Sequence, residues 1–439
     1  MLVFNKRESI LFFIGDLFVF FFSLWISLFI RNLQIPTSSV YFEHTVPFTI
    51  IFVLWILVFF ITGLYDKYTT ILKSKIPLII FNAQVFNSFI AVVFFYIVPY
   101  FGITPKTILF IDILISFILI YIWRVYGQFI FKVKRKIPAI IVGSREEMFA
   151  LEKEVNSNFR VNLKFVSFIN LDKVASVDLI KEIMDLVYAE NVSVIVIDLK
   201  DSRIEPILPN LYNLIFSEIK FIDFYKIYED IFDRIPLTLV KYDWFLENIS
   251  LKPNLGFDIL KRLFDIVVSI VLLVVFIVLL PFVYILIKIE DNGKIFFVQD
   301  RIGKKNKIIK IYKFRTMTSN EKITKIGNFL RKTRIDELPQ ILNVLRGNLS
   351  LIGPRPEKPD LVYLYEKEIP YYNIRHLTKP GLSGWAQICQ DNPPKFEVNF
   401  NDTKTKLSYD LFYLKNKSII LDINIALKTI GSIFLRKGK

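Results

Sequence analysis

The chain has 439 residues, of which 53% are hydrophobic and 16% aromatic, and its formal net charge is +15. This apolar content exceeds what a soluble core needs, so much of it is expected to face lipid. A basic surface beside apolar spans indicates cytoplasmic loops at a membrane, and no nucleic-acid partner is predicted. The single cysteine, Cys389, excludes an internal disulfide framework, and the two histidines exclude a classical zinc site, so any metal must be bound through oxygen.

Four apolar stretches fill the first third of the chain, each near the ~20 residues that a helix needs to cross a bilayer. They cover residues 10–30, 46–65, 77–101 and 107–123. The first is too long for a cleaved signal peptide and lacks its small-residue cleavage site. Because four such runs in succession are hard to bury in a soluble protein, we predict a transmembrane four-helix bundle over residues 1–131.

Positive charges set the orientation of this bundle. They precede the first span, separate the second from the third and follow the fourth: Lys6, Arg7, Lys67, Lys73, Lys75, Lys132, Lys134, Arg135 and Lys136. The opposite loops carry only Arg31 and Lys106. The positive-inside rule therefore predicts that both ends of the bundle face the cytoplasm.

Residues 132–256 have the pattern of a small Rossmann-like α/β domain. A strand is expected to end at Gly143 with a helix capped by Ser144, and a helix over residues 177–188 precedes a buried strand over residues 192–199. Only Gly143 is present of a G-x-G-x-x-G loop, which gives little support for binding a pyrophosphate. A structural scaffold is favoured, and a degenerate regulatory site is the alternative.

A fifth apolar run covers residues 264–287 and has cations on both sides. Lys261 and Arg262 precede it, and six cations follow: Lys288, Lys294, Arg301, Lys304, Lys305 and Lys307. Pro281 lies inside the run, where a missing backbone donor kinks a helix. The segment could enter one leaflet and return, or it could be an ordinary fifth span, and charge alone does not decide between them.

An acidic pair, Asp336 and Glu337, lies in the stretch TRIDELPQILNV. Apolar residues follow at helical spacing: Leu338, Ile341, Leu342 and Leu345. Pro339 is tolerated only in the first turn, so the pair is expected at a helix N-terminus. Unpaired backbone donors and the helix dipole favour anions there, which should keep Asp336 ionised and attract a phosphate.

A carboxylate and a phosphate repel each other, so an attack of one on the other requires neutralisation by a metal ion or by arginine. Adjacent helical residues point about 100° apart, so we expect one carboxylate to attack phosphorus and the other to bind a hard metal. The cationic candidates for a diphosphate are Lys313, Arg315, Arg331, Arg334 and Arg355. In GPRPE, two prolines stiffen the loop around Arg355.

Each of these features also has a simpler interpretation. An Asp-Glu pair before a helix is often only a cap, Arg355 between prolines could be a turn, and KFR could be an edge strand with solvated charges. The order and spacing of the whole set favour a catalytic site.

From about Lys261 to the C-terminus, this set resembles the bacterial sugar transferase family, the polyprenyl-phosphate phosphoglycosyl transferases. The motifs that carry the resemblance are KRLFD, QDRIG, KFRTM, LRKTRIDELPQILNVLRGNLSLIGPRPE, PGLSGWAQ and YDLFYLKNKSIILD. The departures are Asn348, where many members have an acidic residue, and Lys294, where a proline is usual. The N-terminal parts resemble long-form members, which include undecaprenyl-phosphate galactose and glucose phosphotransferases and which suggest a homodimer.

The resemblance implies a two-step reaction that begins the synthesis of an exopolysaccharide, capsule, O-antigen or glycoprotein glycan. Asp336 matches the nucleophile, which would attack the β-phosphate of a UDP-sugar, release UMP and carry a phosphosugar that undecaprenyl phosphate then attacks. Glu337 matches the magnesium ligand, so Mg²⁺ is the expected cofactor. Arg355 with Pro354 and Pro356 matches a motif that grips substrate phosphate, and Gln340 is a further predicted substrate-binding residue.

Sugar nucleotides are cytoplasmic, so both sides of residues 264–287 must share that face. We therefore predict a re-entrant helix-break-helix at Pro281 in a catalytic α/β domain of residues 257–439, as the resemblance also implies. Lys261 and Arg262 would lie at the lipid interface. Amphipathic stretches near residues 361–371 and 425–435, the latter followed by RKGK, would add contacts with lipid. The expected location is the bacterial inner membrane, with the catalytic domain on its cytoplasmic face.

Two other functions are weighed against this one. A processive polymer synthase predicts D-x-D and Q-x-x-R-W motifs, and neither occurs in the sequence. A non-catalytic membrane sensor with a nucleotide-binding Rossmann-like domain would be expected to have a degenerate acidic pair, which this chain does not have.

Overall fold

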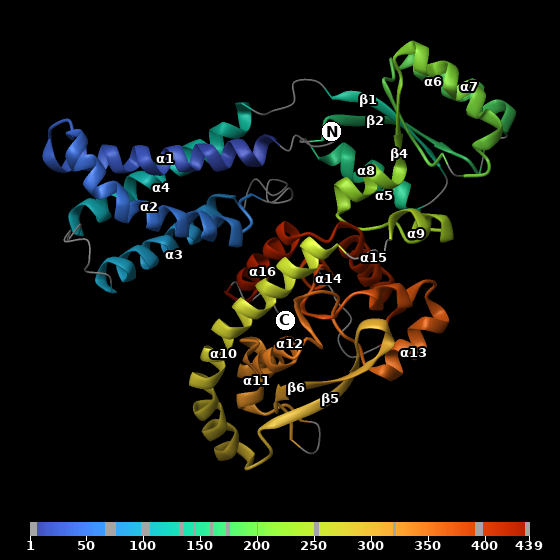
Figure 1. Ribbon diagram of the computed structural model, residues 1–439. Helices are drawn as coiled ribbons and strands as arrows, with labels where there is room; N and C mark the ends of the chain where they lie inside the picture. Colours follow the sequence, from blue (N-terminus) through green and yellow to red (C-terminus); the bar gives the residue numbers. More distant parts are fainter. Residues whose placement is uncertain are drawn as a thin grey trace. The chain divides into compact units, whose positions relative to one another are not determined.

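The structure, a computed structural model, describes residues 7–65, 76–97, 106–130, 136–143, 146–158, 161–172, 176–199, 201–249, 254–318, 322–390 and 398–434 (Figure 1). Several predicted features lie outside these residues: Lys6, Lys67, Lys73, Lys75, Lys132, Lys134, Arg135, Ser144 and the terminal RKGK. The chain divides into two compact units, Met1–Ile231 and Phe232–Lys439. The predicted division into three domains stays a prediction.

The first unit begins with the predicted four apolar helices. They are α1 (Arg7–Asn32), α2 (Ser38–Ile61), α3 (Ile76–Ile97) and α4 (Lys106–Ile130), and each contains a stretch long and apolar enough to span a membrane. The helix α2 begins before the apolar run at residue 46, because the polar residues ahead of it continue the same helix. The prediction of four apolar helices is therefore confirmed, with bounds that differ at the helix ends.

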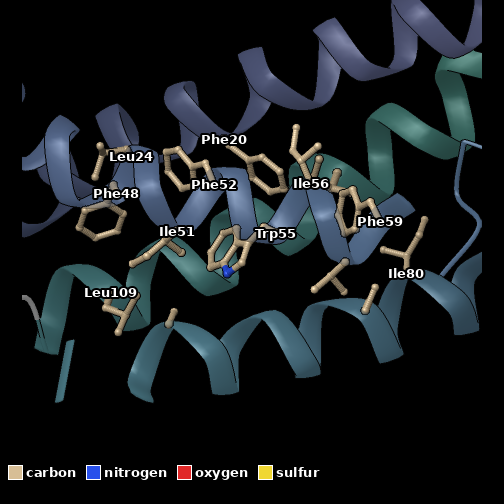
Figure 2. Packing of buried hydrophobic residues seen from close by; sticks show 14 of the residues in the cluster. Phe20, Leu24, Phe48, Ile51, Phe52, Trp55, Ile56, Phe59, Ile80 and Leu109 are labelled. Atoms are coloured by element: carbon tan, nitrogen blue, oxygen red, sulfur yellow. The ribbon is translucent and has the colours of Figure 1, made fainter. Parts of the chain in front are cut away.

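Aromatic side chains fill the interior of this bundle (Figure 2). The ring of Phe20 stacks on Phe52 at 5.4 Å and meets the edge of Trp55 at 5.2 Å. The indole Nε1 of Trp55 donates to Asn87 O at 2.9 Å, so its polar atom is satisfied inside an apolar core.

The bundle also buries an ion pair that the sequence analysis did not predict. Arg124 of α4 pairs with Asp16 of α1, and Tyr65 donates to the same carboxylate at 2.6 Å. Arg124 Nη1 donates to Leu64 O at 2.9 Å, and the guanidinium lies 4.7 Å from the centre of the Tyr65 ring. Charges inside apolar surroundings are tolerated when they are paired in this way.

We expect Asp16→Asn to destabilise the full chain by about 3–5 kcal/mol, because it leaves Arg124 buried without a counter-charge. Melting temperature in detergent micelles measures this effect. Replacing both partners together, Asp16→Leu with Arg124→Leu, should cost less, because no lone charge remains. A single variant that melts no lower than the double variant would contradict the account.

The second part of the first unit is a four-stranded parallel sheet in the order β2-β1-β3-β4. Its elements are β1 (Ile137–Gly143), α5 (Glu146–Ser157), β2 (Leu163–Asn170), α6 (Ser176–Ala189), β3 (Val194–Ile197), η2 (Glu205–Ile207), α7 (Leu208–Asn213), η3 (Leu214–Ser217), β4 (Lys220–Asp223) and α8 (Phe224–Phe232). The predicted strands at β1 and β3 and the helix α6 are confirmed. The sequence analysis missed β2 and β4.

The side chain of Met148 packs against the end of β1. A Cβ added to Gly143 would overlap the sulfur of Met148, so the glycine allows the side chain of Met148 to pack against the strand. Glu147 lies in the first turn of the helix that follows, and its charge disfavours an anion at that N-terminus. These features favour a structural scaffold over a nucleotide site.

The second unit combines helices with two small sheets. After α9 (Tyr242–Asn248) and α10 (Leu255–Asp291), the antiparallel hairpin β5 (Phe296–Ile302) and β6 (Ile308–Phe314) encloses η4 (Lys304–Asn306). Next come α11 (Lys325–Lys332), η5 (Ile335–Gln340), α12 (Ile341–Leu345), β7 (Ser350–Ile352), α13 (Pro359–Glu368), η6 (Tyr372–Leu377), β8 (Gly381–Ser383), α14 (Trp385–Cys389), α15 (Phe400–Asn416) and α16 (Ile419–Phe434). The strands β7 and β8 pair in parallel. Residues before 257 belong to this unit as well, since Ile235 N donates to Ser408 O at 3.2 Å.

The long helix α10 packs one side against this unit (yellow in Figure 1). Phe276, Val283 and Ile287 are buried, whereas many apolar side chains on its other side are exposed. Near its C-terminal end, Glu290 accepts from the amides of Lys325 (2.6 Å) and Ile326 (3.1 Å) at the start of α11.

The predicted break at Pro281 is absent, because α10 is one helix with this proline inside it. Pro281 removes a single i to i−4 hydrogen bond, and the neighbouring turns continue on either side.

Candidate active site

The acidic pair lies where the sequence analysis placed it, at the start of a helical segment. Asp336 and Glu337 are in the first turn of η5, which leads directly into α12. The first turns are 3-10 and continue as α-helix from Ile341. Arg334 precedes η5 with φ at 56°, in the left-handed region, and turns the chain from α11 into η5.

Two cations from distant segments converge on one oxygen of Glu337. Lys313 Nζ, near the end of β6, lies 3.0 Å from Oε1, and Arg355 Nη2 lies 2.8 Å from the same atom. Arg334 Nη1 lies 4.0 Å from the other oxygen, Oε2. Burial alone would raise the pKa of Glu337, but Arg355 and Lys313 outweigh it and hold that pKa well below its usual value. Glu337 is therefore a fixed anion.

Asp336 has the opposite environment. Its side chain is buried, and within the described part of the chain no group donates a hydrogen bond to its carboxylate. Burial, and next the charge of Glu337, raise the pKa of Asp336 to about 6, against the attraction of Lys313, Arg355 and Arg331. The predicted lowering by the helix terminus does not prevail, because the single short turn offsets little of the burial. At pH 7 the carboxylate is still mostly ionised.

The other predicted substrate residues are two arginines with hydrogen bonds to neighbouring segments and three residues of other types. Arg331 donates to Thr316 Oγ1 at 2.9 Å and acts on Asp336 through its charge. Arg315 donates to Met317 O at 2.8 Å, and a Cβ on Gly293 would overlap its guanidinium, so it lies against the segment after α10. Gln340 and Pro354 are buried and Pro356 is half-buried. Their predicted roles stay predictions.

Lys261 and Arg262, predicted at the lipid interface, form contacts within the second unit. Lys261 Nζ contacts Asp422 at 2.6 Å and donates to Ile352 O at 3.0 Å, just before the GPRPE loop. Arg262 donates to Val344 O and Leu345 O, both at 2.7 Å, and so caps the C-terminal end of α12. The first turns of α10 are thereby tied to both parts of the site.

Sequence analysis missed a buried charged group beneath the GPRPE loop. It consists of Arg375, Asp410, Glu357 and Lys406. One signal was available: Asp410 falls on the same helical face as the buried Leu407, Leu411 and Leu414, where a charge requires a buried partner. The partner itself could not be identified from the sequence.

His376 adjoins this group and is 7% exposed. Burial, and next the charge of Arg375, lower its pKa from 6.5 to about 3. Between these values the unfolded chain binds one more proton than the folded chain, so stability is complete above pH 6.5 and falls as the pH drops toward 3. The expected slope is up to about 1.4 kcal/mol per pH unit.

We expect His376→Gln to remove this part of the acid sensitivity. The measurement is the melting temperature of the full chain in detergent from about pH 7 to about pH 4.5, a window set by the lowered pKa. The wild-type chain should lose more on acidification than the variant. Parallel curves for the two chains would contradict a buried neutral histidine.

The carboxylates of Asp336 and Glu337 are the oxygen donors that the site offers to Mg²⁺. Within the described residues, no three His, Cys, Asp or Glu side chains form a metal cage. Mg²⁺ is commonly held by one or two carboxylates together with substrate phosphates and water, and the acidic pair fits that pattern. Because Oε1 of Glu337 is held by two cations, Oε2 is the oxygen that suits a metal.

The fold and the site define a membrane protein whose second unit presents a bare carboxylate beside a carboxylate held by cations. The sequence profile described as "Bacterial sugar transferase" matches residues 257–436. The chain belongs to the bacterial sugar transferase family.

Individual relatives agree with this membership. The chain is 40% identical over 214 residues to UDP-N-acetylgalactosamine-undecaprenyl-phosphate N-acetylgalactosaminephosphotransferase of Aeromonas hydrophila, covering 45% of this chain and 50% of that one. It is 38% identical over 203 residues to exopolysaccharide production protein PSS of Rhizobium leguminosarum bv. phaseoli, covering 41% and 98%. It is 36% identical over 194 residues to UDP-glucose:undecaprenyl-phosphate glucose-1-phosphate transferase of Escherichia coli (strain K12), covering 41% of each. The chain thus spans half or less of the first and third relatives and nearly all of the second.

Proposed function

We propose that this protein transfers a sugar 1-phosphate from a UDP-sugar to undecaprenyl phosphate and releases UMP. The observation that carries the proposal is the contrast within the acidic pair: two cations hold Glu337, whereas Asp336 is bare and has a pKa of about 6. A carboxylate of this kind is ionised at neutral pH and poorly solvated, which suits a nucleophile. The relatives named for undecaprenyl-phosphate sugar transfer support the choice of substrates.

In the proposed first step, a carboxylate oxygen of Asp336 forms a bond to the β-phosphorus of the donor. The bond from that phosphorus to the bridging oxygen breaks, and UMP leaves with this oxygen and the electron pair. In the second step, an oxygen of the prenyl phosphate bonds to the same phosphorus, and the bond to Asp336 breaks. The carboxylate is restored, and a prenyl diphosphate sugar is the product.

The cations around the pair have a clear task in this proposal. Lys313, Arg355 and Arg331 reduce the repulsion between Asp336 and the diphosphate, because each already acts on Asp336 through its charge. Glu337 fixes the positions of Lys313 and Arg355 and would hold Mg²⁺ through its second oxygen. When bound, Mg²⁺ would supply further neutralisation of the diphosphate charge.

We expect Asp336→Asn to lower UMP release on the order of 10⁴-fold or more, because the amide cannot form the covalent intermediate. The assay combines full-length protein in detergent, Mg²⁺, a panel of UDP-sugars and undecaprenyl phosphate. Asp360→Asn, at an exposed acid in α13, is the matched control and should retain activity.

Intact mass measurement tests the intermediate directly. Wild-type protein given the donor alone should gain one phosphosugar, and Asp336→Asn should not. An active chain that never carries the adduct would refute the covalent route, and an unchanged rate in Asp336→Asn would refute the nucleophile.

We propose further that α10 enters the inner membrane from the cytoplasmic face without crossing it. Its N-terminal turns are bonded to Ile352, Val344 and Leu345, and Glu290 near its other end caps α11 in the same compact unit. α10 also packs against this unit in its middle and last turns, through Phe276, Val283 and Ile287, so a crossing of the roughly 30 Å hydrocarbon layer would draw part of the unit into it. The exposed apolar side of α10 would face lipid, and Asp336 would lie near the headgroups of its acceptor.

Labelling of single cysteines tests this topology. In a Cys389→Ser background, we expect Asp258→Cys and Lys294→Cys, at exposed positions near the two ends of α10, to react with an impermeant maleimide from the cytoplasmic face only. Inverted and right-side-out vesicles distinguish the two faces. Labelling of the two positions from opposite faces would show a complete crossing.

A further inference from the structure

The GPRPE loop is held along three successive carbonyl groups. Arg375 Nη2 donates to Arg355 O at 2.9 Å, and Arg301 Nη1 donates to Pro356 O at 3.4 Å. The amide of Ile302 in β5 donates to Glu357 O at 2.9 Å. The prolines restrict φ at their own positions, and Pro356 keeps Arg355 extended with ψ within roughly +120 to +160°, a range that still allows the direction of its carbonyl to vary. The direction of the Arg355 carbonyl reports that angle, so the bond from Arg375 fixes it.

Arg375 is itself held firmly. Its side chain is 1% exposed, Nη2 lies 2.8 Å from Asp410 Oδ2, and Nη1 donates to the Tyr372 hydroxyl at 2.6 Å. Glu357 lies 3.7 Å from Nη1 and also pairs with Lys406. The fork of the guanidinium thus joins the loop to α15 and to η6, a combination of contacts that the single ammonium of lysine cannot reproduce.

Stability alone gives little reason for such a group. Two positive and two negative charges balance, three of them buried and Glu357 half-buried, but a buried ion pair is often no better for stability than apolar residues of similar size. What an apolar replacement could not do is donate to Arg355 O. The side chain of Arg355 also contacts Glu337, with Nη2 2.8 Å from Oε1. The bond from Arg375 to the carbonyl of Arg355 therefore holds the residue that contacts the acidic pair.

We propose that Arg375, held by Asp410, is a positioning residue that sets the direction of Arg355 toward Glu337 and the diphosphate of the donor. The proposal deepens the function proposed above and rests on it. Arg375 touches no reacting atom and acts through Arg355 alone.

Arg375→Lys is the first test, because it keeps the charge and loses the fork. We expect kcat/KM for the UDP-sugar to fall about 10–100-fold, since small misplacements of a positioned group have effects of that size. Arg346→Lys is the matched control: Arg346 is an exposed arginine of the same unit and contacts Tyr312. Its kcat/KM should not change.

A double-mutant cycle distinguishes positioning from general support of the fold. If Arg375 acts through Arg355, then Arg375→Lys should cause little further loss in an Arg355→Lys background. Losses that simply multiply, or full activity of folded Arg375→Lys, would overturn the proposal.

A paired variant covers the case in which Arg375→Lys fails to fold. Arg375→Met with Asp410→Asn removes both charges together, so no lone charge is buried. We expect this variant to melt near the wild-type temperature and still to lose kcat/KM about 10–100-fold. Wild-type kcat/KM in a folded paired variant would overturn the proposal.

Hydrogen exchange separates this inference from the proposed function. In full-length protein, Arg375→Lys should speed exchange at the amides of Ile302 and Gly381, which donate to Glu357 O at 2.9 Å and to Pro354 O at 3.0 Å in this loop, and Arg346→Lys should not. Unchanged exchange would show that Arg375 does not hold the loop, whatever the activity. A wild-type chain that releases no UMP from any donor would refute the proposed function and with it the catalytic purpose of the loop, while the exchange result would still stand.

Discussion

One oxygen of Glu337 receives both Lys313 and Arg355, and the arrangement of the site follows from that shared contact. It joins the end of β6, the first turn of η5 and the GPRPE loop, three segments that are separate in the sequence. Because both cations bond Glu337, they reach Asp336 only through longer-range attraction, which burial and the neighbouring charge outweigh. Two adjacent carboxylates therefore differ in pKa and in contacts because their environments differ, which is the general way in which paired acids acquire separate roles.

The contact of Lys313 and Arg355 with Glu337 depends on further cations that hold the surrounding segments in place. Arg262 caps α12, and Lys261 holds the carbonyl of Ile352 at the entrance to the GPRPE loop. Both belong to the first turns of α10, directly before its exposed apolar part. Arg375, which follows the GPRPE loop in the sequence, donates to the carbonyl of Arg355 in that loop. Lys261, Arg262 and Arg375 thus support the segments that carry the acidic pair and Arg355, and each donates to at least one main-chain carbonyl.

Local pattern in the sequence was sufficient for the parts of the structure that depend on neighbours in the chain. The four apolar helices, the helix start at Asp336 and the candidates Lys313 and Arg355 follow from periodicity, proline position and residue type. The strands β2 and β4 were missed because their burial is incomplete, with exposed or half-buried residues between buried ones, so neither gives a continuous apolar run.

The sequence did not predict which of several arginines contacts the acidic pair. Arg315 and Arg355 are both arginines in conspicuous motifs, yet Arg355 contacts Glu337 and Arg315 lies against Gly293. The charged group around Arg375 shows the same limit, because its members come from segments whose proximity arises only from tertiary packing. Proline stiffness in GPRPE was visible in the sequence, whereas the donors that fix its carbonyls were not.

The distribution of the site over the chain also bears on what the first unit does. All candidate catalytic and substrate-binding residues lie within Phe232–Lys439, a unit with its own apolar cores. The Rhizobium relative is matched over 98% of its length by 41% of this chain, so that protein has no room for a counterpart of both the bundle and the parallel sheet. In this chain, too, the candidate site residues lie outside the first unit. Its sheet has Met148 packed against the last residue of β1, and its helices bury Asp16 with Arg124 and leave apolar side chains outside. These features fit anchoring in lipid and structural support better than a second catalytic centre.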